Sequence, residues 1–194
     1  MQPDDLIFPA AFHKGTAYFL ERADRWSSSY FGGPSEVAIS GLAQDATPLH
    51  HIVTFGCREL PSLGSFGLRM SLFYGMRYSG CRIQCRKLDT SNLEVSEVTP
   101  IAATPDWPYP CYPPYLPYVP MRVSRTLQCD LRVFSELSVQ PQWQVSPGHL
   151  IVIVPASPVV GMSLWGPDGD AERVQIVFEC DVSHGSFRGF NQCA

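Results

Sequence analysis

Apolar and polar residues alternate with a period of two along much of the chain, which is the pattern of strands with one buried face. The alternation is clearest at residues 81–86, where Cys81, Ile83 and Cys85 share one face and polar residues share the other. The run 150–155 is continuously apolar, which is typical of a strand buried on both faces. The same reasoning predicts further strands at residues 49–55, 68–74, 126–133 and 174–181.

One segment near the N-terminus favours a helix instead. Residues 16–25 start with Thr16, a suitable N-cap, and place Glu21 and Arg25 four residues apart. After this segment, glycine, proline, asparagine and aspartate lie between the predicted strands, as expected for turns. The predicted fold class is α+β, with antiparallel-rich sheets in two loosely similar halves and one short N-terminal helix.

A proline and aromatic run, PDWPYPCYPPYLPYVP at residues 105–120, separates the two predicted halves. We therefore expect a single domain over residues 1–194, with sub-halves at about 27–104 and 121–194 joined by this run. Seven prolines exclude a helix or a central strand and favour extended or polyproline II backbone. The aromatic rings of the run are Trp107, Tyr109, Tyr112, Tyr115 and Tyr118.

The tyrosines recur every three residues, so that in polyproline II they lie along one side. Three interpretations stay open: the rings pack inside the protein, they contact a partner, or the run is a linker. Prolines reduce the entropy that a loop loses on binding, which suits a recognition loop. These five aromatic residues are the predicted partner-binding residues.

Composition narrows the classes of partner. The 194 residues carry a formal net charge of −4 and contain no lysine- or arginine-rich run, so nucleic acid is not an expected partner. The start of the chain lacks the features of a signal peptide, and no segment has the length of a membrane span. Seven irregularly spaced cysteines argue against a disulfide framework. We therefore expect a cytoplasmic protein without membrane contact.

Candidate chemistry is sparse. Cys81 and Cys85, with Cys57 or the pair His50 and His51, offer metal ligands or a thiol–imidazole pair, but no zinc-knuckle spacing occurs. Packing is the favoured interpretation for the core-facing cysteines, which are Cys81, Cys85, Cys129 and Cys180. The stretch LWGPDGD at 164–170 favours a turn over a calcium loop. No catalytic residue, metal or cofactor is predicted. Whether the protein is an enzyme stays open, and the sequence favours a protein without enzymatic activity.

Several segments follow one another in a recognisable order. They are SSSYFGGPSE at 27–36, PLHHIVTFGCRELP at 48–61, GLRMSLFYG at 67–75, MSLWGPDGDAERVQIVFECD at 162–181 and SFRGFNQCA at 186–194. In this order they resemble the motifs of the YwqG-like bacterial family, a domain of unknown function. The motif residues, which the resemblance gives a structural role, are Gly32, Gly33, Pro34, Trp165, Gly166, Asp168 and Gly169.

The resemblance implies an α+β fold with extensive antiparallel sheet and a bacterial, cytoplasmic protein. It supplies no catalytic residues, and some relatives are similar to immunity proteins encoded beside secreted toxins. The chain departs from the family at Thr54 and Gly56, where Gln and Asp are usual, and at 105–120, which replaces a Gly-Tyr-Pro corner.

The resulting prediction is a non-enzymatic cytoplasmic protein-binding module, specifically a bacterial immunity protein that binds and inhibits a cognate secreted toxin. The absence of catalytic motifs, the rigid aromatic run and the family pattern support it. Two alternatives stay open. One is an enzyme or small-molecule-binding protein with a pocket between the sheet halves, and the other is a scaffold that docks through its proline-rich segment.

Overall fold

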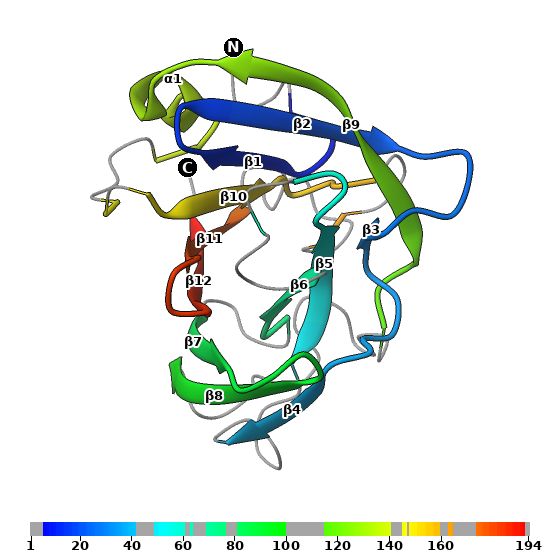
Figure 1. Ribbon diagram of the computed structural model, residues 1–194, viewed down its shortest axis with the longest axis vertical. Helices are drawn as coiled ribbons and strands as arrows, with labels where there is room; N and C mark the ends of the chain where they lie inside the picture. Colours follow the sequence, from blue (N-terminus) through cyan, green and yellow to red (C-terminus); the bar gives the residue numbers. More distant parts are fainter. Residues whose placement is uncertain are drawn as a thin grey trace.

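The computed structural model describes residues 6–41, 49–60, 63, 69–76, 81–99, 115–140, 145–146, 148–159, 163–164 and 174–192. In this part of the chain one 12-stranded sheet dominates, accompanied by a helix of five residues, α1 (Leu131–Ser135) (Figure 1). The strands are β1 (Ala10–His13), β2 (Thr16–Arg22), β3 (Ser29–Phe31), β4 (Ala38–Gly41), β5 (His50–Gly56), β6 (Arg69–Tyr74), β7 (Arg82–Lys87), β8 (Asn92–Thr99), β9 (Val119–Gln128), β10 (Leu150–Val154), β11 (Gln175–Asp181) and β12 (Ser186–Gln192).

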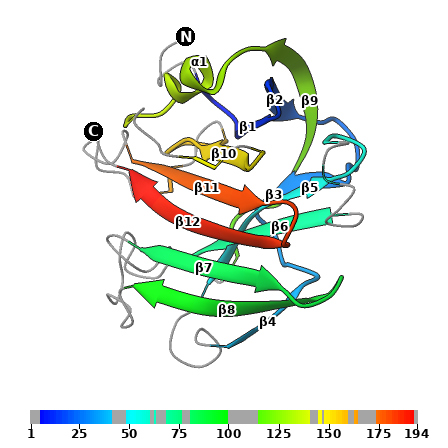
Figure 2. The same ribbon diagram turned by 60° about the vertical axis from the view of Figure 1, so that its left-hand side comes forward.

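The sheet runs in the order β4-β8-β7-β12-β11-β10-β1-β2-β9-β3-β5-β6. Neighbouring strands are antiparallel except for β4 and β8, which pair in parallel. Figure 2 shows β8, β7, β12 and β11 side by side in one layer, with β5 and β6 behind them. The sheet therefore curls, and β6 at its end contacts β12. This curl brings strands that are distant in the sheet order to the two sides of one core.

Two hydrophobic clusters lie on opposite faces of the sheet. The larger cluster fills the curl, and the smaller one lies where α1 covers β1, β2, β10 and β11. In β11, Ile176, Phe178 and Cys180 enter the larger cluster while Val177 enters the smaller. Phe134 of the helix stacks on Phe12 with ring centroids 5.3 Å apart. Burial on both faces explains why β10 is continuously apolar.

The predicted N-terminal helix is wrong, because residues 16–22 form β2. Ala17 and Phe19 of this strand pack into the smaller cluster, and Leu20 packs into the larger one. Lys14 and Gly15 between β1 and β2 both have positive φ, at 48° and 79°. Such a two-residue turn is typical of a tight β-hairpin. The hairpin was missed because lysine takes the place that asparagine or aspartate usually occupies.

The α+β class, with antiparallel-rich sheets in two loosely similar halves, is also wrong. The described residues form a sheet-rich fold in which strands from both ends of the chain interleave, since β1 pairs with β10, β2 with β9, and β12 with β7. One 12-stranded sheet takes the place of the sheets predicted in two loosely similar halves. In addition, the strand predicted at 126–133 ends at Gln128, and α1 begins three residues later.

Other predicted strands are confirmed. Arg82, Gln84 and Arg86 of β7 are exposed while Ile83 and Cys85 are buried, which is the predicted alternation. All residues of β10 are buried. Every residue of β5 is buried as well. Its polar and apolar residues alternate in the sequence, but both of its faces are buried. Among the described residues there is no apolar helix of the length that a bilayer crossing requires.

Candidate functional site

A glycine turn follows β3 and fixes the end of the proline and aromatic run. Gly32 N–H donates to Ile52 O at 2.8 Å, and Gly33 N–H donates to Leu116 O at 2.7 Å. Both glycines have positive φ, and a Cβ on Gly32 would lie 2.2 Å from Pro117 O. Only glycine fits this close backbone approach. The motif glycines of the predicted family pattern therefore have a specific structural role here.

The last residues of the run divide into a buried anchor and exposed rings. Leu116 is 2% exposed and belongs to the larger core cluster, whereas Tyr115 is 60% exposed and Tyr118 is 46% exposed. Tyr118 packs against Tyr30 with ring centroids 5.2 Å apart. The predicted partner residues Trp107, Tyr109 and Tyr112 lie outside the described residues, as do the motif residues Trp165, Gly166, Asp168 and Gly169. Pro34 is exposed beside the glycine turn.

An ion pair lies within electrostatic reach of Tyr118. Arg69 of β6 donates to Glu36 at 2.6 Å, and both side chains reach solvent. Partial burial raises the pKa of Tyr118, and the charge of Glu36 adds to this rise while Arg69 opposes it. The phenol therefore lies within the electrostatic reach of this ion pair. Tyr118 and Arg69 are residue types that recur at binding hot spots.

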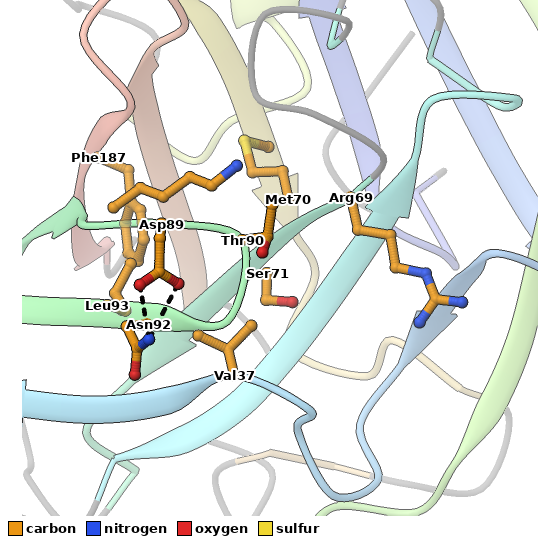
Figure 3. A pocket seen from close by; sticks show the side chains of 10 residues that line it. Val37, Arg69, Met70, Ser71, Asp89, Thr90, Asn92, Leu93 and Phe187 are labelled. Carbon is orange, nitrogen blue, oxygen red and sulfur yellow. Dashed lines mark hydrogen bonds between the residues drawn. The ribbon is translucent and has the colours of Figure 1, made fainter.

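Beyond Arg69 lies a shallow hollow that is partly open to solvent, which we name the Ser71 hollow (Figure 3). Its volume is about 20 Å³, which is room for about one water molecule. Figure 3 shows Ser71 and Met70 in its middle, Arg69 at one end, and Asp89 with Asn92 towards the other. Asp89 accepts from Asn92 Nδ2 and from Ser91 N–H, which fixes the turn between β7 and β8. The lining residues are Val37, Arg69, Met70, Ser71, Lys87, Asp89, Thr90, Asn92, Leu93 and Phe187.

A buried chain of hydrogen bonds joins this hollow to the glycine turn. The Nδ1 atom of His51 is 2.8 Å from Gly32 O, and its Nε2 atom is 2.8 Å from Thr54 Oγ1. Thr54 Oγ1 in turn lies 2.7 Å from Ser71 Oγ. Burial lowers the pKa of His51, although the hydrogen bond to the Gly32 carbonyl partly opposes this effect. The chain is a structural link between the two exposed features.

The sequence did not reveal this chain. Thr54 and Ser71 face each other only because β5 pairs with β6 in a register that sets them opposite. His51 was considered as a thiol partner or metal ligand, yet both of its ring nitrogens are bonded to oxygen atoms. Arg69 and Glu36 were missed as well, since nothing in their local sequence marks the ion pair.

A second polar cluster lies where β11 turns into β12. The buried carboxylate of Glu179 contacts His149 Nδ1 at 2.8 Å and forms an ion pair with Arg188. Asp181 accepts from Ser183 and His184, and these hydrogen bonds lower its pKa. Ser183 and Asp181 both meet the same nitrogen of His184, Nδ1. A proton relay needs opposite ring nitrogens, so this trio fixes the turn rather than activating the serine.

Three of the described cysteines occupy core positions, while Cys57 is half-buried. Cys81, Cys85 and Cys180 are buried, and burial raises the pKa of Cys81 to about 12. Cys129 is half-buried against the smaller cluster instead of facing the core fully as predicted. Within the described residues no group of three or more His, Cys, Asp or Glu side chains is arranged to hold a metal ion.

Comparisons of the chain with protein-family models, with curated proteins and with solved structures find no match. The resemblance to the YwqG-like family therefore stays a prediction. The geometry around the glycine turn defines the candidate site by itself. It combines exposed tyrosines on a fixed backbone, a nearby ion pair, and a hollow that the hydrogen bonds of His51 connect to the glycine turn.

Proposed function

We propose that this chain is a non-enzymatic, cytoplasmic protein-binding module that acts as a bacterial immunity protein and inhibits a cognate secreted toxin. The observation that carries the proposal is the exposure of Tyr115 and Tyr118 on either side of the buried anchor Leu116. The hydrogen bond from Gly33 to Leu116 holds this backbone in place. A partner would therefore meet aromatic rings that are already ordered.

Ordered aromatic rings suit a binding surface for an energetic reason. Side chains that are immobilised on association cost about 0.5–1.5 kcal/mol each, and a fixed loop avoids part of this cost. Tyr and Arg are enriched among residues that dominate binding energy, and Arg69 lies within electrostatic reach of Tyr118. The net charge of −4 favours a basic partner surface over an acidic one.

Inhibition would result from steric occlusion of the toxin by this surface, which requires no catalysis by the immunity protein. The resemblance to YwqG-like proteins, some of which are similar to immunity proteins, supports the same class. Blocking a toxin inside the producing cell requires a cytoplasmic inhibitor, in agreement with the charge and cysteine composition.

Site-specific photocrosslinking tests the proposal. A benzophenone amino acid at Tyr115 should capture one protein in cells that encode both genes, and the product of the adjacent gene is the first candidate. The control position is Val133 of α1, which is exposed to 42% and lies apart from the site. Capture at both positions, or at neither, would contradict the proposed surface.

Affinity and neutralisation measurements then test the named residues with the captured protein. Tyr118→Ala combined with Arg69→Ala should weaken binding at least about tenfold and abolish protection of cells against the toxin. Val133→Ala should leave both measurements unchanged. If the double variant binds and protects like the parent, the tyrosine surface is not the inhibitory site.

A further inference from the structure

A larger hollow lies on the outer face of β7 and β12, and we name it the Arg82 hollow. Its volume is about 380 Å³, and it is partly open to solvent. Ile83 packs into the larger core cluster, so its neighbours Arg82 and Gln84 point to the opposite face, where they line the hollow. Sites for small molecules have volumes of about 300–1,000 Å³, so this hollow has room for such a ligand.

Strand register gathers the side chains that line the Arg82 hollow. Gln84 pairs with Arg188 of β12 on one side and with Glu97 of β8 on the other. Arg82 pairs with Phe190, two residues further along the same strands. Side chains that are directly opposite on neighbouring strands, or two apart on one strand, share a face. The hollow therefore combines two guanidinium groups and an aromatic ring with a carboxylate on the β8 side.

A buried carboxylate fixes Arg188 at this hollow. Glu179 is 6% exposed, and its Oε2 atom accepts from Nε of Arg188 and also contacts Nη2. Its other oxygen, Oε1, lies 2.8 Å from His149 Nδ1. The Nη1 atom of Arg188 has no partner among the described residues, and the side chain is 58% exposed. Arg188 thus presents N–H donors to a ligand without first having to be ordered.

Arg82 supplies the uncompensated positive charge. It is exposed, and no other residue in the described part of the chain forms an ion pair or a hydrogen bond with its side chain. The charge of Arg188, in contrast, is balanced by Glu179. Glu97 is also exposed and lies one strand away from Arg82. This carboxylate opposes a ligand that carries a second negative charge, so the hollow suits a single anionic group.

We infer that the Arg82 hollow binds a small organic molecule that carries one carboxylate and an apolar body. The carboxylate accepts from the guanidinium groups of Arg82 and Arg188, whose planar donors match its geometry. Phe190, which is half-buried at the hollow, provides an apolar contact for the body of the ligand. The lining includes no residue of the tyrosine surface, so the inference goes beyond the proposed function and does not depend on it.

Three small probes test the chemistry of the hollow by nuclear magnetic resonance. 3-Phenylpropionate has both the carboxylate and the apolar body, 3-phenylpropanamide lacks the charge, and acetate lacks the ring. The acid should shift the backbone amide resonances of residues 82–84, 97 and 188–190 with millimolar affinity. It should bind about tenfold more tightly than either of the other probes. Equal affinities for the acid and the amide, or no shift at these residues, would overturn the inference.

Charge variants then locate the carboxylate. Arg82→Gln removes the unpaired guanidinium, so the acid should lose most of its advantage of about tenfold over the amide. Glu97→Gln removes the opposing carboxylate and should tighten binding of the acid by about threefold, with the affinity for the amide unchanged. Both side chains are exposed, so neither change should disturb the core, and the amide resonances distant from the hollow verify the fold.

The matched control is Arg86→Gln. It removes the same charge from the same face of β7, but Arg86 is paired with Glu94 at 2.8 Å and does not line the hollow. The affinity for the acid should change by less than about twofold in this variant. Equal weakening by Arg82→Gln and Arg86→Gln would mean that the general charge of the face attracts the acid, which contradicts a site in the hollow.

Discussion

Gly32 is the residue at which the parts of the candidate site meet. Its carbonyl oxygen accepts from His51, its N–H donates to Ile52, and its Cα lies against the backbone of Pro117. Because φ is +61° here, any side chain would add backbone strain to the steric contact. The position of the tyrosines therefore depends on the lack of a side chain at one residue.

Substitution of Gly32 by alanine should destabilise the protein by about 3 kcal/mol, since about 1–2 kcal/mol comes from the left-handed backbone and the rest from contacts with Pro117 and Leu116. Urea denaturation provides the measurement. The matched control is Gly15→Ala, where φ is +79° but no atom lies within 4 Å of the new Cβ. That variant should lose only about 1–2 kcal/mol. Equal losses would contradict a steric role for Gly32.

His51 should make folding sensitive to mild acid. Its pKa is lowered in the folded state, so the unfolded chain takes up a proton first as the pH falls below about 6.5. Protonation then favours the unfolded state, and the free energy of unfolding falls by up to about 1.4 kcal/mol per pH unit until the folded pKa is reached. Urea titrations between pH 7 and pH 5 measure this slope.

Variants assign the slope to His51. His51→Gln should lose this part of the pH dependence, whereas Thr54→Val keeps the buried imidazole and should keep the slope. The lowered pKa of His13 contributes a further fall of the same sign in every variant. An unchanged slope in His51→Gln would contradict the assignment.

At the scale of elements, the sequence predicts best where a strand either alternates cleanly between a buried and an exposed face or is apolar throughout. β7 shows clean alternation, and β10 is apolar throughout, so both were predicted correctly. The prediction for β2 was wrong because its apolar residues pack on both faces of the sheet. Over a short window the resulting order of apolar residues resembles helical spacing. The pairing of Thr54 with Ser71 depends on strand register, including a shift between His51 and Val53, which no local pattern encodes.

The segment around α1 depends on a buried glutamine at the start of β11. Gln175 donates to Leu137 O and accepts from Val139 N–H, both at 3.0 Å. Gln175→Ala leaves these backbone groups unpaired and should cost about 2–3 kcal/mol in urea denaturation. Amide exchange at Val139 should accelerate in parallel. The control Gln128→Ala removes an exposed side chain that bonds to Thr16 and should cost less than about 0.5 kcal/mol.

The whole molecule is held together by strand pairs between distant parts of the chain. β9 pairs with β2 and β3, β10 with β1, and β12 with β7. Such pairings require long loops to close before their contacts form, so this topology folds slowly compared with helical domains. Among the described strands, neither β1–β8 nor β9–β12 forms the sheet without the other group.

Division of the chain tests this interdependence. Fragment 1–104 carries β1 to β8 and fragment 115–194 carries β9 to β12. Neither fragment alone should show a cooperative thermal transition by circular dichroism, because each exposes strand edges that the other pairs. An equimolar mixture should regain strand signal relative to the sum of the separate spectra. A cooperative transition in either isolated fragment would contradict the interleaved sheet.

The buried thiols of Cys81 and Cys180 report when the sheet opens. Cys81 precedes β7 and Cys180 lies in β11, on the two sides of β12 in the sheet order. Burial raises the pKa of both thiols and shields them, so an alkylating reagent modifies them only after the sheet opens. Equal modification rates at the two positions would mean that the layer opens as one unit. The native cysteines thus allow the opening of the sheet to be timed without an added label.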